Sequence, residues 1–360
     1  HQVITDLNTQ LKAFGSGLLV KYGTPETVFP ELLSTYDIEA VYTNHDFESY
    51  AIERDNMVHE YLQSEGVEFR TFKDHVIFEK NEVLSGSKTP YTVFTPYSRK
   101  WKETLNDFYV KSYPTEKYFS HLSKINLPEP PSLESMGFAP VGMSFPVKEV
   151  KDLLVKNYAE KRDFPAILGT SRLSVHLRFG TVSIRELVKK AQNLSETWLN
   201  ELIWRDFYHM ILWHFPHIAE GKSFKPKYDF IEWRHSENDF QKWCDGQTGY
   251  PIVDAGMRQL WASGWMHNRV RMITASFLVK HLLIDWREGE KWFWDTLVDA
   301  DYGSNAVNWQ WTAGTGVDSN MFVRIMAPLS QSEKFDATHY IREWVPELAA
   351  LQAPYIHDPD

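Results

Sequence analysis

The sequence predicts two domains, an N-terminal α/β domain followed by a larger all-α domain, and three observations support this. Strand-like and helix-like segments alternate over the first hundred residues. Five prolines fall between residues 125 and 150, which is typical of a linker. Beyond residue 151 the apolar spacing is helical throughout. We therefore expect an α/β domain over 1–105, a linker over 106–150 and an all-α domain over 151–360.

The N-terminal part has strand candidates at 16–23, 38–44 and 67–78, and a helical run over 47–65 separates the last two. Strands separated by helices of this length predict parallel βαβ units in a Rossmann-like layer. Three strands are few for such a layer, and the chain begins with His1 rather than Met. We therefore expect N-terminal strands of the sheet to be missing from this chain.

Helix boundaries in the all-α part can be placed from their end signals. Ser183 and Glu186 have capping-box spacing, Ser195 precedes a helical run that reaches Pro216, and Pro251 suits a first helical turn.

Composition narrows the class of protein. The 360 residues are 43% hydrophobic and 24% charged, as in an ordinary globular protein, and no run approaches the roughly 18 apolar residues of a membrane span. We expect a cytoplasmic monomer. Cys244 is the single cysteine, which excludes an intramolecular disulfide and a cysteine-based metal cage.

The net charge of -10 argues against a surface that grips nucleic acid all over. Residues 198–280, however, carry ten Lys/Arg against nine Asp/Glu, so this is the least acidic region. An anion-facing surface is expected there.

The same region is rich in tryptophan, because twelve of the fourteen tryptophans lie between Trp198 and Trp311. Core packing is the default for any one of them. Stacking platforms for unpaired bases and a relay for single electrons are two functional alternatives, and spacing does not decide between them.

A first polar cluster lies on one helical face, where Trp198, Glu201, Arg205 and Tyr208 follow at spacings of three or four, with Trp204 beside them. Two interpretations stay open. The Glu and Arg form an internal ion pair in a core helix, or they line an aromatic ligand pocket.

A second cluster places Asn268, Arg271 and Met272 on one turn, with Arg269 on a different face, while His267 is interpreted as structural. One arginine would then face inward and the other solvent or phosphate.

Asp299 and Asp301 are spaced for acid–base work, but no ligand-spaced His or Glu accompanies them, so no metal is expected. GTSRLS (169–174) offers hydroxyl and amide groups that suit phosphate, although a simple turn explains it as well.

Long motifs in a fixed order then point to a known family. These are TGYPIVDAGMRQL (248–260), NRVRMITASFLVKHLLIDWR (268–287), YAEKRDFP, GTSRLS, WLNELIWRDFY and DADYGSN, with VFTPYSRKW (93–101) as a weaker match. The chain resembles the photolyase/cryptochrome family over nearly all of 151–345, and in particular the bacterial class I photolyases that repair cyclobutane pyrimidine dimers.

The resemblance implies an α/β antenna domain and a helical domain that binds FAD, in an enzyme that is a carbon–carbon lyase. Arg271 and Asp299 would form an ion pair beside the flavin, with Asn305 facing its N5 atom. The full set of implied FAD-binding residues is Tyr158, Thr170, Ser171, Leu173, Ser174, Trp198, Arg205, Asn268, Arg271, Asp299, Asp301 and Asn305.

The resemblance also implies UV-damaged DNA as the partner, with the dimer flipped out of the duplex and split by an electron from photoexcited reduced FAD. Glu201 would stabilise the dimer radical anion, which requires a raised pKa. The implied lesion pocket consists of Glu201, Trp204, Arg205, Asn268, Met272 and Trp311. The implied phosphate contacts are Arg162, Arg269 and Arg324. The implied electron chain is Trp309, Trp286 and Trp233, and the implied packing tryptophans are Trp213, Trp243, Trp261, Trp265, Trp292 and Trp294.

Asn305 and Met272 favour dimer repair within the family. A light-signalling cryptochrome is the alternative, and a light-independent single-strand binding module is a third hypothesis. An antenna chromophore, methenyltetrahydrofolate or deazaflavin, stays open. Asn44, Asp46 and Glu48 resemble an antenna segment, but Glu220 stands where folate-binding relatives place a lysine.

Overall fold

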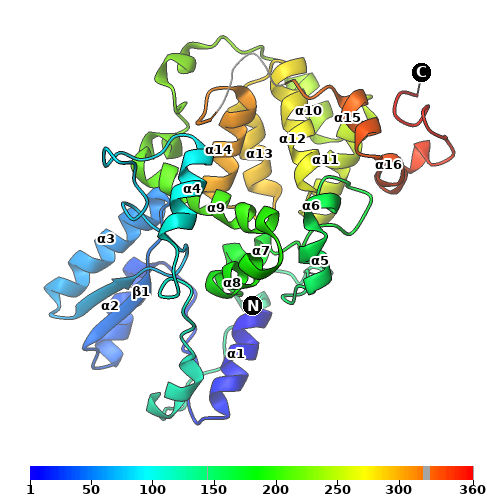
Figure 1. The fold of residues 1–360 in the computed structure, drawn as a ribbon. Helices are drawn as coiled ribbons and strands as arrows, with labels where there is room; N and C mark the ends of the chain where they lie inside the picture. The colour runs from blue at the N-terminus through cyan, green and yellow to red at the C-terminus, as the bar shows by residue number, and fades with distance from the viewer. Residues whose placement is uncertain (144, 319–324, 360) are drawn as a thin grey trace. The chain divides into compact units, whose positions relative to one another are not determined.

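The computed structural model describes residues 1–143, 145–318 and 325–359, and the chain divides into two compact units (Figure 1). The first unit comprises residues 1–46, 50–75 and 110–145, and the second comprises 47–49, 76–109 and 146–360. Among the described residues, no helix combines the length and hydropathy that a bilayer span requires.

A parallel pair of strands forms the sheet of the first unit. Strand β1 (Ala40–Asn44) pairs with β2 (Glu68–Phe72), and Ala40 lies opposite Glu68. The connection between the strands is helix α3 (Ser49–Ser64), so the predicted parallel βαβ unit is present. The unit's other elements are α1 (Gln2–Lys12), α2 (Pro25–Thr35) and the short 3₁₀ helices η1 (Thr115–His121) and η2 (Glu134–Met136).

The third predicted strand, at 16–23, is wrong. Its backbone has no ladder partner among the described residues, and Leu18 N donates instead to the side-chain Oδ1 of Asn8 at 2.8 Å. Strand β2 also ends at Phe72 rather than near residue 78. A run of apolar residues alone does not show where its backbone finds hydrogen-bond partners.

The second unit is helical in its described residues. Its α-helices are α4 (Phe94–Thr104), α5 (Asp152–Lys156), α6 (Tyr158–Lys161), α7 (Ser174–Arg178), α8 (Ile184–Leu194), α9 (Glu196–His214), α10 (Glu237–Cys244), α11 (Pro251–Ser263), α12 (Asn268–Ser276), α13 (Trp286–Thr296), α14 (Tyr302–Ala313), α15 (Pro328–Lys334) and α16 (Thr338–Trp344). Shorter elements are the 3₁₀ helices η3 (Pro216–Glu220), η4 (Pro226–Phe230) and η6 (Pro346–Leu348), and the π-helical turn η5 (Phe277–His281).

The predicted helix ends are confirmed. Ser183 accepts from Glu186 N at 3.4 Å, and Ser195 accepts from Trp198 N at 3.3 Å. Pro251 is the first residue of α11. These signals are local, which is why the sequence could give them.

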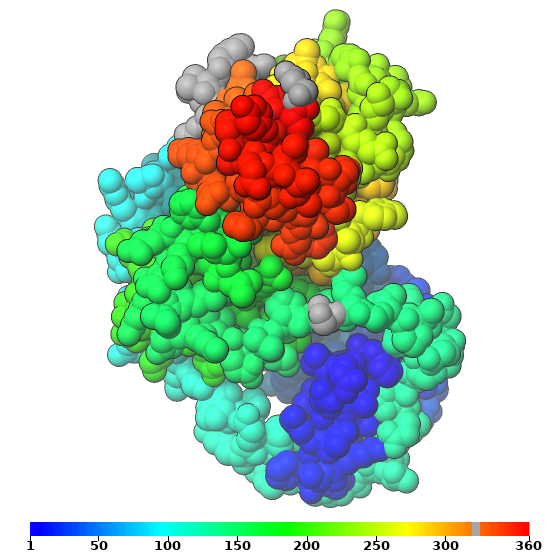
Figure 2. Space-filling model, turned by 90° about the vertical axis from the view of Figure 1, so that its right-hand side faces the viewer, coloured from blue at the N-terminus to red at the C-terminus, as the bar shows by residue number. Residues whose placement is uncertain are grey.

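The main hydrophobic core lies among helices α10 to α14, where Trp243, Leu260 and Leu278 are fully buried. Helices α15 and α16 pack on α11 and form the surface coloured orange to red in Figure 2. Cys244 belongs to this core, and burial raises the pKa of its thiol to about 12.

A buried carboxylate holds residues 76–109 to the helical unit. Asp206 of α9 is 1% exposed, and it accepts from Trp101 Nε1 at 2.9 Å and from the backbone N of Ile77 and Phe78 at 3.2 Å each. The compact units therefore divide at different residues from the predicted boundaries of 1–105, 106–150 and 151–360, because 76–109 joins the helical unit and 110–145 the first unit.

Replacing Asp206 by alanine is expected to lower the free energy of unfolding by about 3 kcal/mol or more, since it strands three buried donors. Urea unfolding followed by circular dichroism measures the loss. Asp107→Ala, at an exposed site in the same unit, should change the free energy of unfolding by less than about 0.5 kcal/mol. Equal effects of the two substitutions would contradict the role given to Asp206.

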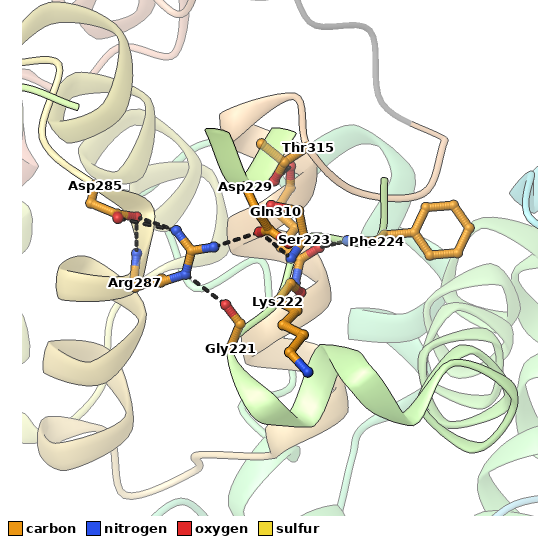
Figure 3. Close-up of polar contacts among 9 residues, drawn as sticks. All are labelled: Gly221, Lys222, Ser223, Phe224, Asp229, Asp285, Arg287, Gln310 and Thr315. Atoms are coloured by element: carbon orange, nitrogen blue, oxygen red, sulfur yellow. Dashed lines mark hydrogen bonds and ion pairs between the residues drawn. The ribbon is translucent and has the colours of Figure 1, made fainter. Parts of the chain in front are cut away.

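A second polar network fixes the loop after η3 against α13 and α14 (Figure 3). Arg287 donates to Asp229 Oδ1 at 2.7 Å, to both oxygens of Asp285 and to the backbone O of Gly221 at 2.6 Å. The fully buried Gln310 accepts from Phe224 N at 2.7 Å and donates to Lys222 O at 3.0 Å. The network holds α14, the helix of Asn305, Trp309 and Trp311, in place.

Candidate active site

A cavity of about 550 Å³ opens in the second unit, within the size range of sites for small molecules and cofactors. Helices α7, α9, α12 and α14 line it, together with parts of α4 and α13. It brings together many of the residues predicted for the site, namely Arg162, Ser174, Glu201, Trp204, Arg205, Asn268, Arg271, Met272, Asp299, Asp301, Asn305, Trp309 and Trp311.

One wall of the cavity is the polar face of α9. Trp204 stacks on Phe94 with ring centroids 3.5 Å apart, and Glu201 forms an ion pair with Arg162. Burial raises the pKa of Glu201, although the neighbouring Arg162 opposes that shift. The arginine paired with Glu201 is Arg162, which lies outside the α9 face of the first interpretation, and both Glu201 and Arg205 line a ligand-sized cavity, as the second interpretation expects.

Helix α12 forms another wall, and a buried histidine starts it. His267 Nδ1 accepts from Arg269 N at 3.2 Å, and burial lowers the pKa of His267 to about 4, so the ring is neutral at pH 7. This agrees with the structural role expected of His267. Arg269 and Arg271 diverge as predicted, because Arg269 pairs with Asp163 at 2.6 Å and Arg271 pairs with Asp299.

The Arg271–Asp299 pair is close and well satisfied. Arg271 Nη2 donates to both Asp299 oxygens, at 2.9 and 3.1 Å, and its Nε donates to Met266 O at 2.8 Å. Asp299 is only 5% exposed. A buried carboxylate is costly unless it is paired in this way, so either single substitution would leave an uncompensated charge at the cavity wall.

Asp301 caps α14 through Ser304 N, which donates to its Oδ1 at 2.8 Å, and His209 Nε2 lies 3.3 Å from its other oxygen. Burial opposes ionisation, but His209, Arg205 and the Ser304 bond together hold the pKa of Asp301 well below its ordinary value. His209 is not among the residues predicted for the site. Its only signal was the spacing of four from Arg205, whose carbonyl contacts His209 Nδ1 at 2.8 Å.

Asn305 is oriented by Glu290, which is also not among the predicted residues. Its Nδ2 donates to the backbone O of Glu290 at 3.0 Å and to Glu290 Oε1 at 2.8 Å. Burial raises the pKa of Glu290. With both amide hydrogens engaged, the carbonyl oxygen of Asn305 is the group left for a ligand in the cavity.

Trp309 lines the cavity and is 2% exposed. A Cβ at Gly289 would lie 2.2 Å from its ring, so only glycine lets α13 and this indole approach so closely. The ring contacts Phe293 at 5.0 Å and Trp243 at 6.1 Å between centroids.

These aromatic contacts continue from Trp243 to the surface. Trp243 contacts Phe240 at 5.9 Å, Phe240 contacts Trp292 at 6.5 Å, and Trp292 stacks on Trp261 at 6.1 Å. Trp261 is 72% exposed, so the interpretation that it serves core packing is wrong. The apolar spacing of α11 does not show that Trp261 faces solvent.

The remaining predicted residues do not belong to the cavity lining among the described residues. Trp198 and Leu173 are buried at 3%, and Trp286 is 1% exposed beneath Arg287, whose Cζ lies 4.8 Å from its ring centroid. Arg324 lies outside the described residues. The others in this group are Tyr158, Thr170, Ser171, Trp233 and Arg269.

The cavity residues fit FAD. An ion pair, a carbonyl acceptor on Asn305 and hydroxyl donors such as Ser174 suit the polar edges of a flavin, and Trp309 and Phe293 supply flat apolar walls.

Comparison with known proteins decides the family. Residues 198–360 match the FAD binding domain of DNA photolyase, and residues 1–117 match the DNA photolyase family. The chain belongs to the DNA photolyase family. It is therefore an enzyme of this family with FAD as its cofactor.

Relatives in this family align along nearly the whole chain. A deoxyribodipyrimidine photo-lyase of Agrobacterium fabrum is 38% identical over 382 residues, covering 100% of this chain and 79% of that protein. One from Synechococcus is 38% identical over 375 residues, covering 96% of this chain and 77% of the relative.

Two solved structures are also similar. A class III photolyase from Agrobacterium tumefaciens has a TM-score of 0.87 at 37% identity, covering 99% of this chain and 78% of its own. A Synechocystis cryptochrome has a TM-score of 0.79 at 27% identity, and the match covers 98% of this chain and 78% of the cryptochrome. The assignment to class I within the family stays a prediction.

Proposed function

We propose that this chain splits cyclobutane pyrimidine dimers in DNA in a light-dependent reaction. The observation that carries the proposal is the cavity, in which Glu201 with its raised pKa stands on one wall and the Arg271–Asp299 pair and Asn305 stand on others. When bound and reduced, FAD supplies the light absorption and the single electron that the dimer borrows and returns.

The protein's part in holding FAD is to orient it and set its electronic surroundings. Arg271 and Asp299 are proposed to flank the flavin, and Asn305 to accept a hydrogen bond at its N5 edge. Glu290 fixes the direction of that amide. Asp301 keeps a negative charge in the same wall, because His209 and Arg205 stabilise its ionised form.

Binding of the flipped-out dimer requires an apolar cleft that contains one carboxyl group. A dimer cannot be reached inside a duplex and must be extruded, and its weakened pairing lowers the cost. Trp204 and Trp311 are proposed as the apolar walls, with Asn268 and Met272 beside them. Glu201 then offers a carboxyl O–H to the carbonyl oxygen on which the extra electron of the dimer resides.

Charged residues near the cavity are proposed to hold the DNA backbone. Arg162, Arg269 and Arg324 are the candidates for phosphate contacts. Trp309, Trp286 and Trp233 are proposed to carry electrons to the flavin site when oxidised FAD must be reduced. The contact between Trp309 and Trp243 supports a second route for electrons out of the cavity, as an alternative to the route through Trp286.

A light-signalling cryptochrome is the second candidate function, favoured by the similarity to the Synechocystis cryptochrome. An antenna chromophore stays a proposal, and a similar archaeal photolyase from Sulfolobus tokodaii, with a TM-score of 0.78 at 32% identity, contains two FAD molecules. The match covers 99% of this chain and 80% of the Sulfolobus tokodaii protein.

The deciding experiment exposes the reduced, FAD-loaded protein and an oligonucleotide with one thymine dimer to near-UV light. Dimer loss is followed by chromatography, with a dark sample and an undamaged oligonucleotide as controls. We expect light-dependent loss of the dimer. Flavin-loaded protein that leaves the dimer intact in the light would reject repair and favour signalling.

A further inference from the structure

Four charged residues form a chain of alternating sign beside the cavity. Glu201 of α9 pairs with Arg162, Arg162 Nε lies 3.7 Å from Asp163 Oδ1, and the same Asp163 oxygen lies 2.6 Å from Arg269 Nη2 of α12. Helix α6 and the residues after it thus connect α9 to α12 (Figure 1). We call these four residues the charge chain.

Each arginine of the charge chain also rests on an aromatic ring. Arg162 Cζ lies 5.4 Å from the centroid of Tyr158, and Arg269 Cζ lies 4.6 Å from that of Phe335. Both arginines retain some exposure, 26% for the side chain of Arg162 and 17% for that of Arg269. Both guanidinium groups are therefore paired with carboxylates and still accessible to solvent.

An anion from outside competes directly with such a partner. DNA phosphates bind arginine through the same fork of N–H groups that a carboxylate uses. A phosphate that replaces Glu201 keeps Arg162 paired, so the exchange leaves no uncompensated guanidinium group. Glu201 is the partner whose own chemistry would change, because it also lines the cavity.

We propose that Arg162 is shared between Glu201 and DNA. In the free protein it pairs with Glu201, and in the complex a backbone phosphate takes it over, so that Glu201 loses its counter-charge and takes up one proton from solvent. Asp163 is the positioning residue that keeps Arg269 beside this exchange. The inference rests on the proposed function, since it requires DNA at this cavity.

The surroundings of Glu201 favour protonation once Arg162 has left. Burial already raises the pKa of Glu201, and Arg162 is the largest influence that lowers it. Asp163 raises it further. The other charged and titratable groups that line the cavity are Arg178, Arg205, Tyr208, Asp301, Asp318 and the Arg271–Asp299 pair, and Tyr158 lies against Arg162 outside the lining.

The proton has a use in the complex. A carboxylate only accepts hydrogen bonds, whereas a protonated carboxyl has an O–H to donate. DNA binding would thereby convert Glu201 into a donor at the moment when the dimer carbonyl needs one. Without DNA, Arg162 opposes protonation of Glu201.

The test measures proton uptake on binding in the dark. The FAD-loaded protein is titrated with a duplex that contains one thymine dimer, between about pH 5 and pH 8, and by calorimetry in two buffers of different ionisation enthalpy. One proton taken up makes affinity rise as pH falls, by as much as about tenfold per pH unit between the free and bound pKa of Glu201. The pKa of Glu201 in the free protein is already raised above its ordinary value by burial, and the loss of Arg162 in the complex is expected to raise it further.

Variants separate the charge chain from other titrating groups. Glu201→Gln is expected to abolish the uptake, and Arg162→Gln to abolish it as well, because Glu201 has then lost its partner before DNA arrives. Arg234→Gln breaks an Arg–Asp pair elsewhere in the second unit, 2.5 Å long with Asp239, and should keep the uptake of the parent.

Equal proton uptake by the parent and Glu201→Gln would overturn the inference even if Arg162→Gln could not be purified. Failure of the proposed function looks different. In that case the FAD-loaded parent would bind damaged and undamaged duplexes alike, at every pH.

Discussion

Replacing Trp309 by phenylalanine is expected to slow light-driven reduction of the bound flavin by at least about tenfold, equivalent to about 1.4 kcal/mol of barrier. Phenyl is oxidised far less readily than indole, so the substitution removes an electron donor while it keeps an apolar ring. Trp309 lines the cavity and is 2% exposed, so it lies between the cavity and the protein interior. Absorbance of the flavin during blue-light illumination with an external reductant measures the rate.

Repair by chemically reduced enzyme serves as the control, because it bypasses the electron chain. Trp309→Phe should repair dimers at the parental rate under those conditions. Photoreduction as fast as in the parent would remove Trp309 from the chain.

Two further substitutions then identify the route. Trp286→Phe tests the chain implied by the family, and Trp243→Phe tests the aromatic series seen in the structure. The variant in which photoreduction of the flavin is slower identifies the pathway that carries the electrons.

Replacing Glu201 by alanine is expected to lower the rate of dimer splitting in the loaded complex by about tenfold or more, since a hydrogen bond to a charged group contributes about 1.5–3 kcal/mol. The quantum yield of repair falls with that rate. DNA binding should stay at the parental level or become tighter, because Arg162 loses its carboxylate partner and is available to phosphate. Repair per absorbed photon and the Kd for a damaged duplex are measured on the same preparation.

Glu201→Gln is the matched variant, because glutamine keeps an N–H donor in nearly the same volume. It should retain more of the splitting rate than alanine does. If Glu201 acted only in binding, its replacement by alanine would raise the Kd for the damaged duplex and leave the repair per absorbed photon of the bound complex unchanged.

Local signals explain how much of the fold the sequence could predict. Caps at Ser183 and Ser195 and the first-turn Pro251 depend on neighbours within four residues, and all three lie where predicted. The segment 16–23 was mistaken for a strand, because its partner, Asn8, is a side chain rather than a strand. The anchoring of 76–109 by Asp206 depends on contacts more than a hundred residues apart, which no local pattern records.

The candidate site divides along the same line. Glu201 and Arg205 share a helical face by spacing alone, and family motifs supplied the Arg271–Asp299 pair. His209, Glu290 and Asp163 act on predicted residues through space. Asp163 stands in the motif YAEKRDFP, but the spacing of that motif does not show its ion pair with Arg269. Side chains that orient other side chains are therefore the part of the site that needed a structure.

The burial of Cys244 has a practical consequence for studying the protein in solution. The thiolate is the form that reacts with maleimide dyes, and a thiol with a pKa of about 12 inside the core has almost none of it at pH 7. A second cysteine placed at an exposed position, such as Trp261, could therefore carry a single fluorophore with little background labelling. Distances from that dye to a labelled duplex would report how DNA lies on the helical unit, and Cys244 would not have to be removed.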